Sequence, residues 1–72
     1  MSDPQYAIAT LANVIEAAVE NLPDYQARVV EAKKHVPNDI LTAIEAYRVS
    51  GIKIRPLTKD DHISIARRWL TN

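Results

Sequence analysis

The stretch that decides the fold is residues 7–22, AIATLANVIEAAVENL. Placed at 100° per residue, its apolar side chains fill one broad arc, and polar side chains line the other side. The arc is wide enough to contact two neighbouring elements, so we expect a central amphipathic helix. Asp3 suits the N-cap and Pro4 the first helical position, which predicts a helix from about Pro4 to Asn21. The apolar arc contains Ala7, Ile8, Leu11, Ala12, Val14, Ile15, Ala18, Val19 and Leu22.

Three residues that interrupt helices divide the rest of the chain. Pro23 and Pro37 disrupt backbone hydrogen bonding, and Gly51 stands where a left-handed C-cap residue belongs. The segments between them carry apolar residues at helical spacing. We therefore expect three further helices, over about Pro23 to His35 or Val36, about Asp39–Ser50 and about Lys59–Leu70.

Polar residues near the predicted helix ends support these boundaries. Asn38 is a favourable N-cap for the third helix. Thr58 and Asp61 have the spacing of a capping box at the start of the fourth, with Asp in place of the usual Glu or Gln. Asp24 and Arg28 are spaced for an i,i+4 ion pair in the second helix.

Residues 52–57 break the helical pattern. Their first four residues, IKIR, alternate apolar and basic side chains as in a strand, and Pro56 limits strand pairing. We expect an extended crossing between the third and fourth helices; the alternative is a strand that pairs with its copy in a dimer or with another protein. The predicted fold is all-α, a single compact four-helix domain over residues 1–72 with this extended segment. Its predicted core contains Ile8, Leu11, Ile15, Val19, Leu22, Tyr25, Val29, Ile40, Ile44, Tyr47, Ile54, Leu57, Ile65 and Trp69.

Length and composition narrow the class of protein. The chain has 72 residues, of which 47% are hydrophobic and 25% charged, as in an ordinary globular domain. A domain this small has a thin stability margin, and the absence of cysteine excludes disulfides. Stability then requires either close helix packing or a homodimer. Without a signal sequence or an apolar run of membrane-spanning length, we expect a soluble cytoplasmic protein with no membrane partner.

Residues that could support catalysis are few. The chain has no cysteine and one glycine, which leaves no thiol nucleophile and no glycine-rich phosphate loop. Neither His35 nor His62 has the spacing of a metal motif. We expect His35 to pair with Glu31 at a helix end, and His62 to be a surface or boundary residue. The sequence therefore predicts a non-enzymatic protein without a metal or cofactor.

Charge is distributed unevenly although the formal net charge is zero. All the charged side chains of residues 1–27 are acidic, whereas basic side chains outnumber acidic ones in residues 48–72. A basic end beside a tryptophan suits an acidic protein partner, because Trp and Arg are enriched at interface hot spots. The leading hypothesis is a small regulatory protein that binds and modulates or inhibits a partner protein. The predicted contact residues are Arg48, Lys53, Arg55, Lys59, Arg67, Arg68 and Trp69.

Two alternatives remain open. The same basic residues would serve a small dimeric DNA- or RNA-binding regulator through phosphate contacts. The third option is a structural subunit of a larger assembly, contacted through the first helix. In size, in its single helical domain and in its lack of a catalytic signature, the chain is similar to small accessory regulators and inhibitors of phages, plasmids and bacteria. That likeness of length and composition favours binding over catalysis.

Overall fold

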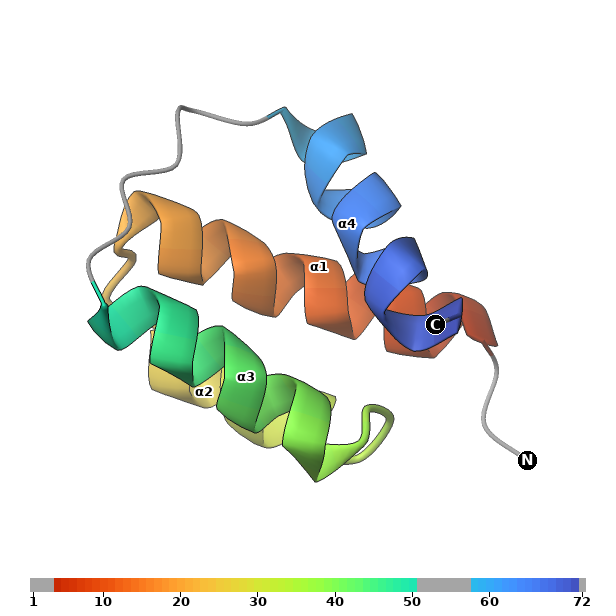
Figure 1. The fold of residues 1–72 in the computed structure, drawn as a ribbon, viewed down its shortest axis with the longest axis horizontal. Coiled ribbons are helices and arrows are strands. Elements are labelled where there is room, and N and C mark those ends of the chain that lie inside the picture. The colour runs from red at the N-terminus through yellow and green to blue at the C-terminus, as the bar shows by residue number, and fades with distance from the viewer. Residues whose placement is uncertain (1–3, 51–57, 72) are drawn as a thin grey trace.

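The computed structural model describes residues 4–50 and 58–71, and it confirms the all-α fold. The helices of this part of the chain are α1 (Pro4–Glu20), α2 (Tyr25–Ala32), α3 (Asn38–Val49) and α4 (Lys59–Thr71) (Figure 1). The proposed extended segment at 52–57 lies outside the described residues, as do the expected N-cap Asp3, the expected C-cap Gly51 and the predicted core residues Ile54 and Leu57.

Helix α1 is the central element (Figure 1). It packs against α4 on one side and against α2 and α3 on the other, so its apolar arc serves more than one neighbour, as expected. Leu11, Val14 and Ala17 are fully buried at its centre. The buried hydrophobic side chains are Ala7, Leu11, Ala12, Val14, Ile15, Ala17, Tyr25, Ala32, Val36, Leu41, Ile44 and Ala66.

Small side chains at the helix contacts set the spacing of the bundle. Ala12 and Ala17 of α1, Ala32 of α2 and Ala66 of α4 are all buried. The distance between packed helices depends on the side chains at the contact, so alanine lets the backbones approach closely. Small contact residues suit a domain that has little apolar area to bury.

The end of α1 is fixed by a left-handed residue. Asn21 has φ of 54°, a conformation that asparagine tolerates better than most residues. The N–H of Leu22 donates to the carbonyl of Ala17 at 3.0 Å, the long-range bond of a Schellman motif. The helix therefore ends at Glu20, one residue before the predicted boundary.

Helix α2 is shorter than predicted. It begins at Tyr25, and after Ala32 the chain continues in tight turns, with the His35 N–H donating to the Ala32 carbonyl at 2.9 Å. Pro37 lies just beyond and disfavours helix in the residue before it. Pro37 itself occupies the N-cap position of α3, with ψ of 141°, so the prediction that Asn38 is the N-cap was wrong.

Two local predictions are confirmed. The Thr58 N–H donates to Asp61 Oδ2 at 3.1 Å, and the Asp61 N–H donates to Thr58 Oγ1 at 3.3 Å, which is a reciprocal capping box. Arg28 Nε donates to Asp24 Oδ2 at 2.9 Å, the expected i,i+4 pair. Both interactions depend on residues close in sequence, which is why spacing alone could predict them.

Three predictions about side-chain environments were wrong. Tyr47, expected in the core, is 52% exposed, whereas His62, expected at the surface, is 2% exposed. His62 lies one turn before Ala66 on the side of α4 that packs on the bundle, so its ring is enclosed with that alanine. His35 stacks on Tyr6 with ring centroids 5.6 Å apart, and Glu31 pairs instead with Lys34, 3.3 Å away.

Candidate partner-binding surface

The structure brings together only part of the predicted basic surface. Arg67, Arg68 and Trp69 follow one another near the end of α4, whereas Lys59 begins the helix. Lys59 and Arg67 are eight positions apart on the helix, a rise of about 12 Å. The side chains of Arg67 and Arg68 are exposed, and neither forms an ion pair within residues 4–50 and 58–71.

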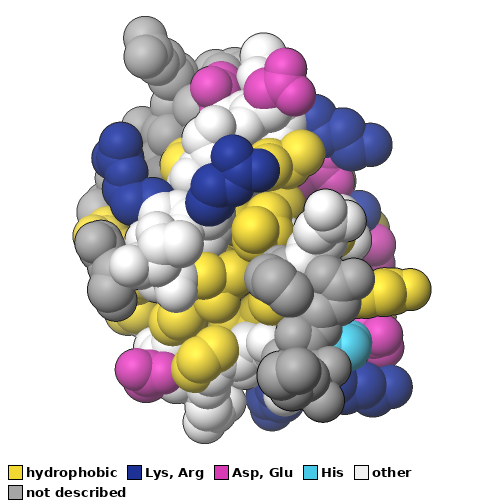
Figure 2. Space-filling model, turned by 90° about the vertical axis from the view of Figure 1, so that its right-hand side faces the viewer, with side chains coloured by type: hydrophobic (Ala, Val, Ile, Leu, Met, Phe, Trp, Pro, Cys, Tyr) yellow, Lys and Arg dark blue, Asp and Glu magenta, His cyan; other side chains and the backbone are white. Residues whose placement is uncertain are grey.

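The end of the molecule where α1 begins and α4 ends carries hydrophobic surface. Figure 2 shows a band of hydrophobic side chains across this end, with Lys and Arg side chains along its upper border. Half-buried hydrophobic residues from three helices pack at the edge of the core, among them Ile8, Ile40, Ile65 and Leu70. Apolar area bordered by cations is a composition typical of protein-binding surfaces.

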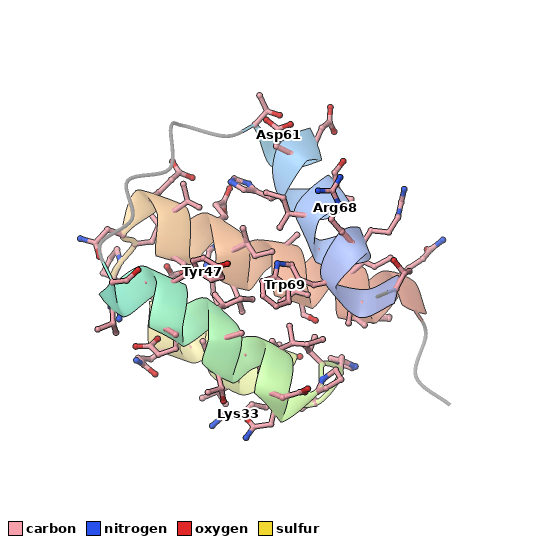
Figure 3. The ribbon with its side chains drawn as sticks, in the orientation of Figure 1. Lys33, Tyr47, Asp61, Arg68 and Trp69 are labelled. Carbon is pink, nitrogen blue, oxygen red and sulfur yellow. The ribbon has the colours of Figure 1, made fainter. Side chains whose placement is uncertain are left out.

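An aromatic pair bridges α3 and α4. The rings of Tyr47 and Trp69 meet edge to face, with centroids 6.3 Å apart and planes at 83°. Trp69 is half-buried, and its ring extends from α4 toward α3, with Arg68 higher on the same helix (Figure 3). At 100° per residue Arg68 points about 100° away from Trp69 and Arg67 about 160° away, so Arg68 is the nearer of the two cations. We therefore define the aromatic–arginine surface as Tyr47, Arg68 and Trp69.

Tyr47 is the functional candidate that sequence reasoning missed. Its spacing from Ile40 and Ile44 assigned it to the buried face of α3. However, three residues correspond to 300°, so Tyr47 lies about 60° to one side of Ile44, at the border of the stripe. A residue at a border can face either the core or solvent. Because tyrosine is enriched at interfaces, a tyrosine at this border could have indicated a surface contact.

Arg48 is engaged within the fold. Its guanidinium lies 4.4 Å from the centre of the Tyr25 ring, and its Nη1 is 3.2 Å from Glu45 Oε1. Burial, together with the nearby Glu45 carboxylate, raises the pKa of Tyr25 well above its usual value. Arg48 thus holds the end of α3 to the start of α2, and we remove it from the candidate surface. Lys53 and Arg55 lie outside the described residues.

A second charged cluster joins α1 to α2. Arg28 Nη1 donates to Glu16 Oε1 at 2.6 Å and to the Asn13 carbonyl at 3.0 Å, while its Nε binds Asp24. The hydrogen bond from Arg28 lowers the pKa of Glu16, against the opposing effect of desolvation. The Arg28 guanidinium is therefore occupied by partners on α1 and beside α2. We interpret this cluster as a structural link between the two helices.

Two shallow hollows flank the polar side of α1. One, of about 220 Å³, lies between α1 and α2, and the other, of about 130 Å³, lies between α1 and α4. The first is lined by Thr10, Asn13, Ala27, Arg28 and Glu31, and the second by Ala9, Ala12, Asn13, Glu16, Lys59, His62 and Ile63.

The hollows offer little chemistry. The Thr10 hydroxyl donates to the Tyr6 carbonyl at 2.8 Å and is therefore occupied. Both ring nitrogens of His62 are buried and have no hydrogen-bond partner in the described part of the chain. Within residues 4–50 and 58–71, no three His, Asp or Glu side chains are grouped so that they could hold a metal ion. The aromatic–arginine surface is therefore the stronger functional candidate.

Comparison of the chain with protein-family models, with curated proteins and with solved structures found no match. Among the described helices, none combines the length and the apolar character needed to cross a membrane. The function of this protein must therefore be inferred from its own residues.

Proposed function

We propose that this protein is a small non-enzymatic regulator that binds an acidic partner protein through the aromatic–arginine surface. The observation that supports the proposal most directly is the exposed Tyr47 ring, edge to face with Trp69, on the helix whose Arg68 has no ion pair in the described part of the chain. Aromatic rings supply large contact area at low entropic loss, and an unpaired guanidinium can bind a partner's carboxylate in a bidentate manner.

The distribution of charge favours a protein partner over nucleic acid. The exposed cations of α4 share the helix with Asp60 and Asp61, and the calculated isoelectric point of the chain is about 6.7. A nucleic acid presents a continuous row of phosphates, which these carboxylates would repel. An acidic protein segment can place its carboxylates near Arg68 alone.

The single tryptophan makes the surface directly observable. Trp69 is the only tryptophan of the chain, so its fluorescence reports contacts at the proposed site. We would titrate the protein with synthetic peptides that combine glutamates with one aromatic or leucine residue. We expect a saturable change in emission that Arg68→Glu weakens about tenfold or more, because the substitution replaces an attraction by a repulsion.

A distant charge reversal is the matched control. Lys33 is exposed and lies at the opposite side of the molecule from α4 (Figure 3), so Lys33→Glu changes the net charge equally without touching the surface. Equal losses for both variants would show a general charge effect and contradict the proposal. In parallel, binding to a mixed-sequence DNA duplex that falls steeply with salt would favour the nucleic-acid alternative.

A further inference from the structure

The charge pattern on the outer side of α4 is complementary to the same pattern on an antiparallel copy of the helix. At 100° per residue, the exposed residues Asp60, Asp61, Ser64, Arg67, Arg68 and Thr71 all lie within about 60° of Ser64. We call these six residues the outer stripe. His62 and Ala66 lie on the opposite side of the helix and are buried, so the stripe faces away from the bundle.

The two ends of the outer stripe carry opposite charges around a small central residue. Two aspartates lie toward its N-terminal end and two arginines toward its C-terminal end, with Ser64 midway between them. Compensation of the helix dipole explains the sign of each charged end. Burial of the opposite side of α4 keeps these charges on the exposed side, but neither burial nor the dipole requires a small residue between them.

We propose that α4 pairs with α4 of a second copy of this chain, antiparallel, across a two-fold axis beside Ser64. In that arrangement Asp60 lies opposite Arg67 of the second copy, and Asp61 lies opposite Arg68 of the second copy. The symmetry makes each ion pair twice. Within the described residues Asp60, Arg67 and Arg68 have no ion-pair partner, and Asp61 uses only Oδ2 to cap the helix.

Helix geometry places the two Ser64 residues close together. Packed helix axes lie 8–10 Å apart, and Cα atoms lie about 2.3 Å from their axis. Two Ser64 residues beside the axis of symmetry would therefore have Cα atoms about 3.4–5.4 Å apart, and the upper part of this range overlaps the Cα separation of about 4.4–6.8 Å that a disulfide spans. Exposed ion pairs contribute little each, so we expect a weak, salt-sensitive dimer that forms at high protein concentration.

Cysteine replacement tests the pairing without any partner protein. The natural chain has no cysteine, so Ser64→Cys introduces a single thiol. Under mild oxidation we expect a disulfide-linked dimer that forms at least tenfold faster than with Ser50→Cys, the control at an exposed serine on α3's C-terminal side. Equal rates for the two variants would overturn the proposal.

Complementary charge variants provide a second test. In a dimer of Asp60→Arg, positions 60 and 67 that face each other are both basic, and in a dimer of Arg67→Glu they are both acidic. Each variant alone should therefore associate at least tenfold more weakly than the natural chain. An equimolar mixture restores both attractive pairs, and sedimentation should detect a mixed dimer. A mixture that associates no better than its components would refute the pairing.

The dimer and the proposed partner share Arg68, but these tests can fail separately from the proposed function. Arg67 points away from the aromatic–arginine surface, and neither test includes an acidic partner. If Arg68→Glu loses peptide binding but Ser64→Cys forms disulfide-linked dimers no faster than its control, the proposed function is supported and the dimer is rejected. If both hold, a second copy covers Arg68 in the free protein, and an acidic partner must compete with the dimer for it.

Discussion

The buried His62 gives the sharpest stability prediction. Neither of its ring nitrogens has a hydrogen-bond partner within residues 4–50 and 58–71, and the side chain is 2% exposed. A buried polar group without a partner destabilises a fold by about 1–3 kcal/mol, whereas an apolar group of similar shape avoids that loss. We therefore expect His62→Leu to raise the free energy of unfolding by about 1–3 kcal/mol.

The assay is urea unfolding followed by circular dichroism at one fixed pH for all variants. For a domain of this size, 1 kcal/mol corresponds to about 4–8 °C in melting temperature, so thermal melts should show the same gain. The matched control is His35→Leu. Because His35 stacks on Tyr6, that variant should lose about 0.5–1.5 kcal/mol.

The outcome that would refute this reasoning is a His62→Leu protein no more stable than the natural one. That result would mean that the imidazole satisfies its nitrogens in solution, or that its shape fits the contact between α1 and α4 better than leucine does. Retention of the same helical signal in both variants is needed for the comparison, because it shows that the same folded state is being measured.

Three further predictions concern the core, a cap and an ion pair. Leu11→Ala should lower the free energy of unfolding by about 2–5 kcal/mol, while Val49→Ala, at a 72% exposed site, should change it by less than about 0.5 kcal/mol in the same urea titration; similar losses would show that the core is misplaced. Thr58→Ala should cost about 0.5–2 kcal/mol and speed amide exchange in the first turn of α4; unchanged exchange would argue against the capping box. Because the pKa of Glu16 is lowered in the folded state, its pair with Arg28 stabilises the fold above the ordinary carboxyl value of 4.5, and this contribution is lost as the pH falls through the lowered pKa. Glu16→Gln should therefore melt below the natural chain at about pH 7, and the gap should close as the pH falls through the lowered pKa of Glu16; a gap that does not narrow in acid would contradict the assignment.

Features encoded by neighbouring residues could be predicted from the sequence. The apolar period of residues 7–22 predicted α1, and Pro37 marked the break between α2 and α3. The capping box of Thr58 and Asp61 forms as its spacing predicts. In each case the partners lie within a turn or two along the chain, so local geometry decides whether they meet.

The candidate surface was only partly predictable. Arg68 and Trp69 were identified by residue type, but Tyr47 was assigned to the core and Arg48 to the contact surface. Arg48 is engaged by the ring of Tyr25, which lies more than twenty positions earlier in the chain. No pattern within α3 indicates which side chain of α2 will face it.

The sequence by itself determined the helical class, the approximate helix limits and the central place of α1, because these follow from period, capping and interruption within short segments. Only the tertiary structure decided which way each border residue faces. His62 is enclosed and Tyr47 is exposed because the rotation of a helix about its axis is set by the neighbours that it packs against. Those neighbours are far away in sequence, and close packing lets them select one rotation among several that the apolar stripe allows.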